Sequence, residues 1–242
     1  MQLASHDIRG MTEAQSAAHA NRVHIVDIAD IPGGGYLTLL RWRDTFSIEY
    51  GEEELMGSCV RHSEEALAAL ACKRLDNPHA SVLIGGLGMG FTLGAALAAL
   101  PAGASVVVAE LVPKIVAWAR GPLAHLFGDS LSDPRVSLEI IDVHDVIDRE
   151  HARFDTILLD VDNGPDGLIQ LANDRLYCNW GLRAAHAALR PGGILAIWSA
   201  YADEAFADRL KAADFAVDEV TMAANDREDA GTHTIWLASR LG

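Results

Sequence analysis

SVLIGGLGMGFTLGAAL, residues 81–97, joins an apolar run to a helix-like pattern through four glycines within the six residues Gly85–Gly90. In an open parallel sheet, the turn after the first strand lets a ligand approach the backbone and the free N–H groups of the next helix. A pyrophosphate is disfavoured, because Phe91 stands where a G-x-G-x-x-G fingerprint counted from Gly86 needs its third glycine. A tight turn that binds nothing is the alternative. The predicted ligand contacts are Gly85, Gly86, Gly88 and Gly90.

The segments after Pro78 alternate between strand-like and helix-like patterns. Strands such as SVVVAE and DTILLD are apolar throughout, as expected when helices cover both faces of a parallel sheet. The last two, FAVDEVTM and HTIWLASR, have only a polar loop between them and are predicted to form an antiparallel hairpin. The pattern predicts a doubly wound, Rossmann-like α/β fold with a mainly parallel sheet. The predicted strands are 81–84, 105–110, 136–141, 154–160 and 194–199, and the predicted helices are 91–100, 113–126, 143–150, 174–189 and 203–212.

The N-terminal quarter has a different pattern. Residues 1–20 are predicted to be a flexible tail, and residues 21–60 alternate apolar and polar side chains as a small antiparallel β meander does. The run HSEEALAALACKRL then predicts a helix with Ser63 as its N-cap. Residues 61–242 are predicted to form the ligand-binding α/β domain.

Composition excludes several classes of protein. The chain has 242 residues, half of them hydrophobic, and a net charge of -15, which disfavours nucleic acid as a partner. Three cysteines without a C-x-x-C pair indicate a reducing compartment, so a cytoplasmic location is predicted. No uninterrupted apolar stretch is long enough to suggest a membrane span. No metal is expected, because the spacing of the histidines does not match that of metal ligands.

Acidic residues end the next two predicted strands. Glu110, followed by Leu111, stands where one carboxylate can accept both hydroxyls of an adenosine ribose. Asp142 ends the third strand, where it can accept from an adenine amino group while Val143 packs on the ring. The alternative for each acid is a cap on the following helix. Together with the glycine-rich turn, these acids predict an adenosine pocket without a phosphate site, which points to S-adenosylmethionine or a close relative.

The fourth strand carries the predicted chemistry. DTILLD ends in Asp160, and Asp162 follows two residues later, before a Gly-Pro turn. Either carboxylate could orient a cationic amine or accept its proton as the amine attacks the carbon beside a sulfonium. The alternative is a pair of solvated loop acids. Asp160 and Asp162 are the predicted catalytic residues, and Asp160 is also a predicted cofactor contact.

Across residues 36–200 the chain resembles the spermidine synthase family of class I S-adenosylmethionine-fold transferases. The resemblance lies in the N-terminal meander, the helix HSEEALAAL and the motifs VLIGGLGMG, VVVAE, DPRVSLEIID, FDTILLD and ALRPGGILAIWS. It implies a class I methyltransferase fold whose cofactor is S-adenosylmethionine or its decarboxylated form. It also implies that Gly86, Glu110 and Asp142 hold the adenosyl moiety, and that Asp160 is the catalytic acid that receives an amine.

The chain departs from that family on the acceptor side. The family helix reads Tyr-His-Glu-Met-Leu-Ala-His, where this chain has Ser63–Ala69, without the aromatic residue or either histidine. The family gate reads Asp-Ser-Ser-Asp-Pro, where residues 160–164 read DVDNG. We therefore expect a transferase acting on a small molecule, an amine among the candidates, with methyl transfer slightly favoured over aminopropyl transfer. A non-catalytic binding or dimerisation module is the third alternative.

A homodimer is also expected. The meander has exposed strand edges and apolar side chains, which suit pairing between two subunits. The residues predicted for this contact are Leu39, Trp42, Phe46 and Ile48.

Overall fold

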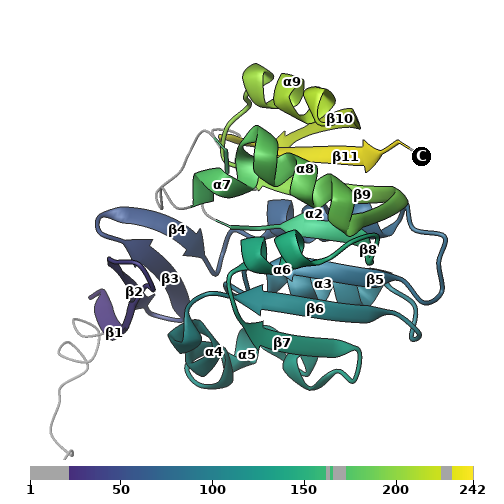
Figure 1. Ribbon diagram of the computed structural model, residues 1–242. Helices are drawn as coiled ribbons and strands as arrows, with labels where there is room; N and C mark the ends of the chain where they lie inside the picture. The colour runs from purple at the N-terminus through teal and green to yellow at the C-terminus, as the bar shows by residue number, and fades with distance from the viewer. Residues whose placement is uncertain (1–21, 162–163, 166–172, 225–230, 242) are drawn as a thin grey trace, which may run out of the picture.

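The computed structural model describes residues 22–161, 164–165, 173–224 and 231–241, and it contains two β-sheets (Figure 1). The first sheet is antiparallel, with its strands in sequence order. As predicted for this region, it is a meander. Its strands are β1 (His24–Asp30), β2 (Tyr36–Trp42), β3 (Thr45–Tyr50) and β4 (Glu53–Gly57).

The second sheet has seven strands in the order β10-β11-β9-β8-β5-β6-β7. Strands β5 to β9 pair in parallel, whereas β11 pairs antiparallel with both β9 and β10. The predicted doubly wound fold with a C-terminal antiparallel hairpin is confirmed. The strands are β5 (Ser81–Gly85), β6 (Ser105–Glu110), β7 (Val136–Ile140), β8 (Phe154–Leu159), β9 (Leu189–Ser199), β10 (Phe215–Ala223) and β11 (Thr232–Arg240).

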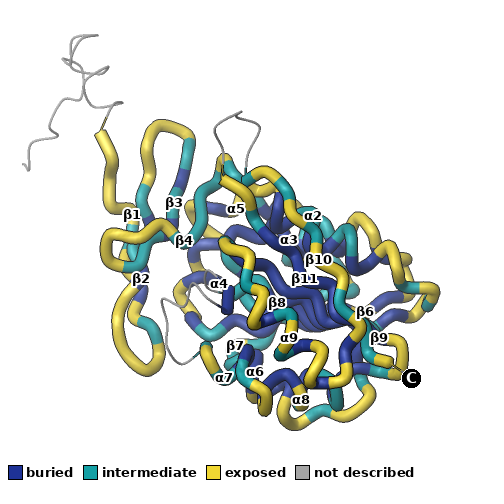
Figure 2. The backbone as a smooth tube through the Cα atoms, turned by 90° about the horizontal axis from the view of Figure 1, so that it is seen from above, coloured by how far each residue is buried: buried dark blue, intermediate teal, exposed yellow. Residues whose placement is uncertain are grey.

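Helices cover both faces of this sheet, and each face has its own core. Alternate residues of one strand enter different cores: Val82 and Ile84 of β5 pack with α2 to α5, and Leu83 packs with α6 to α9. The inner strands β5, β6 and β8 are therefore mostly buried, dark blue in Figure 2, whereas the edge strands β7 and β10 are more exposed. The helices are α2 (His62–Cys72), α3 (Phe91–Ala99), α4 (Pro113–Arg120), α5 (Ala124–Phe127), the 3-10 turn η1 (Ser130–Ser132), α6 (Val143–Arg149), α7 (Asp174–Tyr177), α8 (Asn179–Ala188) and α9 (Glu204–Ala212).

Some helix predictions were wrong in detail. The helix predicted over 113–126 ends at Arg120 and is followed by the short α5, because Gly121 and Pro122 interrupt the pattern. Ser63 is not an N-cap: α2 begins at His62, and the Ser63 hydroxyl bonds to other side chains. No helix in the described part of the chain is long and apolar enough to cross a membrane.

Asp27 joins the N-terminal sheet to the α/β unit. Its Oδ2 accepts a hydrogen bond of 2.9 Å from the indole N–H of Trp118 and lies 3.1 Å from Nζ of Lys114. The Trp118 hydrogen bond, followed by the Lys114 contact, lowers the pKa of Asp27. These contacts tie β1 to α4 and hold the small sheet beside the end of the large one.

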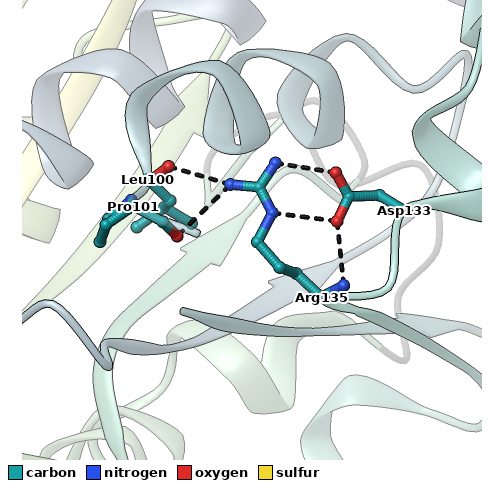
Figure 3. A network of polar contacts seen from close by, with 4 residues as sticks. All are labelled: Leu100, Pro101, Asp133 and Arg135. Carbon is teal, nitrogen blue, oxygen red and sulfur yellow. Dashed lines mark hydrogen bonds and ion pairs between the residues drawn. The ribbon is translucent and has the colours of Figure 1, made fainter. Parts of the chain in front are cut away.

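Arg135 fixes the start of the edge strand β7 (Figure 3). Its guanidinium forms two parallel hydrogen bonds to Asp133, at 2.9 and 2.8 Å, and also donates to the carbonyl oxygen of Leu100 at 2.9 Å. Arg135 lowers the pKa of Asp133 to about 2. The DPR part of the DPRVSLEIID motif thus anchors the start of β7 to the end of α3.

Gly90, at the start of α3, is required by packing. Its φ is 84°, in the left-handed region, and a Cβ atom there would lie 2.4 Å from the Phe127 ring. Any other residue would have to displace that ring while adopting an unfavourable backbone conformation.

We predict that Gly90→Ala destabilises the fold by about 2 kcal/mol or more, through left-handed backbone strain and the clash with Phe127. Gly94→Ala, in the same helix, is the matched control, because its nearest neighbour would be 4.0 Å away. Alanine there should stabilise the helix by about 0.5–1 kcal/mol. Equilibrium urea unfolding measures both changes, and equal effects of the two substitutions would contradict the packing argument.

Candidate active site

A cavity lies where the carboxyl ends of the parallel strands meet the N-terminal sheet. Its roof is apolar and comes from the meander and the residue after β1. Its floor carries the residues that end β5, β6, β7 and β8. The roof residues are Ile31, Leu37, Tyr50 and Leu55, and the floor includes Gly86, Gly88, Glu110, Leu111, Asp142, Val143 and Asp160.

Glu110 organises two turns of the floor. Its Oε2 accepts from the N–H of Leu87 and its Oε1 from the N–H of Val112, both at 2.8 Å. The side chain is buried, and burial raises its pKa although these N–H groups favour the charged form. Glu110 thus joins the glycine-rich turn to the turn after β6, and its carboxylate faces the cavity.

The four glycines have different surroundings. Gly86 has a φ of 85°, and a Cβ atom there would lie 2.5 Å from the carbonyl oxygen of Asp160. Gly88 lies under Met56 of β4, whose sulfur accepts from the N–H of Met89 at 3.1 Å. Gly86 and Gly88 line the cavity; the predicted contacts Gly85 and Gly90 are not among its lining residues.

Asp142 is an N-cap, as the alternative interpretation proposed. Its Oδ1 accepts from the N–H of His144 at 2.9 Å, and its Oδ2 pairs with Arg175. Val143 is buried beside Gly85 and lines the cavity. The proposed roles of Asp142 and Val143 toward adenine stay predictions.

Asp160 sits where the cavity meets a buried polar group of side chains. The Thr92 hydroxyl donates to its Oδ2 at 2.6 Å and lies 3.4 Å from the carbonyl oxygen of Glu64. Burial, followed by the negative charge of Glu64, raises the pKa of Asp160 to about 7. Burial also raises the pKa of Glu64. Such a carboxylate can exchange a proton at neutral pH.

Sequence reasoning missed Glu64 and His233 as parts of the site. Ser63 and Glu64 are buried, with the Ser63 hydroxyl donating to Glu64 Oε2 at 2.6 Å. The same hydroxyl oxygen is 2.8 Å from Nδ1 of His233, the second residue of β11. The sequence did carry one sign that these residues differ in role: Ser63 and Glu64 do not match the residues of the family helix.

Two aromatic side chains of α7 and α8 make contacts of other kinds. Tyr177 is buried and donates to the carbonyl oxygen of Val161 at 3.1 Å, whereas Trp180 is exposed and stacks on His144. Asp162 lies outside the described residues. Among the residues that are described, no group of His, Cys, Asp and Glu side chains is arranged to hold a metal ion.

Comparisons with known proteins agree on the fold. No protein-family model and no curated protein matches the sequence. A spermidine synthase from Thermotoga maritima matches with a TM-score of 0.71 at 16% identity, over 89% of this chain and 72% of that one. A spermidine synthase in complex with the transition-state analogue AdoDATO matches with a TM-score of 0.69, the same identity of 16%, and the same coverage of 89% and 72%.

A third match is a methyltransferase. The 1,6-didemethyltoxoflavin-N1-methyltransferase of Burkholderia thailandensis, with bound 1,6-didemethyltoxoflavin and S-adenosylhomocysteine, has a TM-score of 0.53 at 23% identity, over 75% of this chain and 80% of that one. Identities this low establish the fold alone. The chain has a spermidine synthase-like class I methyltransferase fold, so the resemblance is confirmed at that level.

We predict that the stability of the protein falls as pH rises between 3.8 and about 7, because Asp160 holds a proton in the folded chain but not in the unfolded one across that window. Asp160→Asn should make the stability depend less on pH over this window. Melting temperatures of both proteins over a pH series measure the effect. Asp76→Asn, at an exposed position, is the control, and equal slopes for wild type and Asp160→Asn would refute the prediction.

Proposed function

We propose that the protein transfers a group from an S-adenosyl donor to a small molecule, with the adenosyl moiety beside Glu110. The observation that carries the proposal is the buried Glu110 carboxylate at the tip of β6, which lines the cavity. The N–H groups of Leu87 and Val112 hold this carboxylate in place, and its oxygens are the acceptors that we propose for the ribose hydroxyls. The apolar roof is suited to cover an adenine ring.

The charge of the cavity favours a donor that lacks a carboxylate. Glu110, Asp142 and Asp160 line it, and no lysine or arginine of the described chain does. Arg175 adds a positive charge nearby, but that charge is paired with Asp142. The N–H of Met89, in the glycine-rich turn, is bonded to Met56. These observations move the proposal from methyl transfer toward aminopropyl transfer from decarboxylated S-adenosylmethionine, whose tail carries only an ammonium group.

Asp160 is the proposed catalytic residue. In the transfer, the lone pair of an acceptor amine forms a bond to the carbon beside the sulfonium. The carbon–sulfur bond breaks, and its electron pair stays on sulfur to give a neutral thioether. The proton that the nitrogen loses passes to the Asp160 carboxylate. A pKa near 7 suits a group that takes up and releases a proton at neutral pH.

Methyl transfer is the second candidate. It is favoured by the likeness to a methyltransferase, which at 23% has a higher identity than the two spermidine synthases. The altered acceptor helix, with Ser63 and Glu64 in place of an aromatic residue and a histidine, also suits a different acceptor. The cytoplasmic location stays a prediction from the cysteine content.

We predict that calorimetry detects binding of 5′-methylthioadenosine, the nucleoside product of aminopropyl transfer. Decarboxylated S-adenosylmethionine should bind at least about tenfold more tightly than S-adenosylmethionine, because repulsion of a carboxylate by the cavity acids is worth about 1.4 kcal/mol or more. Glu110→Gln should weaken nucleoside binding about ten- to hundredfold, the scale of hydrogen bonds to a charged group.

Glu219→Gln, at an exposed position on β10, is the matched control and should bind as wild type does. Tighter binding of S-adenosylmethionine than of its decarboxylated form would favour methyl transfer instead. Absence of binding for all the nucleosides, with the fold intact by circular dichroism, would refute the donor proposal and leave the non-catalytic module.

We also propose a homodimer, formed through β1. The residues predicted for the contact are mostly unsuitable, because Leu39, Phe46 and Ile48 are buried within the chain and only Trp42 is exposed. The edge strand β1 instead carries exposed apolar side chains on or beside it. They are Val23, Ile25, Val26 and Ile28.

We predict a dimeric mass for the wild type and a monomeric mass for Ile25→Glu, since a buried charge in this contact has no partner. Ile25 is 66% exposed, so the substitution should not disturb the monomer. Ile140→Glu, at an Ile that is 51% exposed on the other sheet, is the control. Analytical ultracentrifugation measures the mass, and a monomeric wild type would overturn the proposal.

A further inference from the structure

Glu64 and Asp160 form a pair of carboxyl groups beside the cavity, and neither is ion-paired with a lysine or arginine among the described residues. The charges that act on Glu64 are those of Glu65 and His62, and the charge that acts on Asp160 is that of Glu64. No lysine or arginine in the described part of the chain is among them. Carboxylates removed from water need a counter-charge, a proton or hydrogen bonds to offset the loss of hydration.

The position of Glu64 is fixed by contacts with distant parts of the chain. Ser63 donates its only hydroxyl hydrogen to Glu64, so its oxygen accepts from Nδ1–H of His233, 2.8 Å away. Burial lowers the pKa of His233, which keeps the ring neutral at neutral pH. The edge of the ring packs against Trp198 of β9, with 4.7 Å between ring centroids. Glu64 is therefore held at one place beside Asp160.

We propose that Glu64 is a positioning residue for Asp160: its carboxyl group is held beside Asp160 by Ser63 and by the Thr92 hydroxyl that contacts both residues, and when ionised it favours transfer of the acceptor's proton to Asp160. The charge acts through space, because Thr92 donates to Asp160 while it touches only the backbone carbonyl oxygen of Glu64. The identity of the reaction rests on the proposed function, but the effect of one carboxylate on the other does not.

The groups that contact the pair or act on its charge come from three elements. Helix α2 contributes the titratable His62 and Glu65, β11 contributes His233 through its bond to Ser63, and α3 contributes the Thr92 hydroxyl. The charge of Glu65 raises the pKa of Glu64, and that of His62 lowers it. Glu65 is also paired with Arg61 at 3.4 Å, toward the protein surface.

The test is a pH titration of protein with carbon-13 in its side-chain carboxyl groups, followed by nuclear magnetic resonance. Asp160, identified by the signal that Asp160→Asn removes, should titrate near pH 7 in the wild type. Glu64→Gln keeps the size of the side chain and removes its charge, so the Asp160 midpoint should fall by about one pH unit or more. Glu65→Gln, the same substitution at the next residue, should change it much less.

A second measurement keeps the proposal testable if Glu64→Gln does not fold. Coupling between two acids is reciprocal, so Asp160→Asn should lower the midpoint of Glu64 by a similar amount. An Asp160 midpoint that is the same in wild type and Glu64→Gln, or a Glu64 midpoint unaffected by Asp160→Asn, would overturn the proposal. Both readouts need no donor or acceptor, so failure of the nucleoside to bind would leave them unchanged.

Discussion

The contact between Gly86 and the backbone of Asp160 is the constraint on which the site depends. A Cβ atom at Gly86 would lie 2.5 Å from the Asp160 carbonyl oxygen, so only glycine lets the turn after β5 and the end of β8 come this close. Because β5 lies between β6 and β8, Glu110 at the end of β6 and Asp160 after β8 both lie beside the same turn. The cavity floor is therefore one connected backbone surface, held by Glu110 and bordered by Asp160.

The parts of the site that could be predicted from the sequence are those that follow from parallel strands. Gly86, Glu110, Asp142 and Asp160 all follow or end an apolar segment, and parallel strands bring their carboxyl ends to one edge. The alternation of strands and helices is therefore enough to predict that these residues lie at one site. The same reasoning predicted the C-terminal hairpin, since no helix separates its strands.

The remainder of the site depends on contacts that no local pattern contains. His233 reaches Ser63 across 170 residues only because β11 inserts between β9 and β10 and runs antiparallel, so that its first residues meet the start of α2. A serine and an acid at a helix start resemble a capping pattern, and the competing bond to Glu64 is visible only in three dimensions. Likewise, Gly90 resembles a ligand contact in the sequence, but it makes room for Phe127.

The charge of the site links its stability to its occupancy. Glu64 and Asp160 hold protons more tightly than free acids do, so the empty site is least stable when both are ionised. A sulfonium or ammonium group beside them supplies the missing positive charge and therefore favours the ionised form that can act as a base. Binding of a cation and loss of the proton are thus coupled, and a ligand with a carboxylate would work against both. The net charge of -15 over the whole chain acts in the same direction, because it draws cations toward a cavity that no lysine or arginine of the described residues lines.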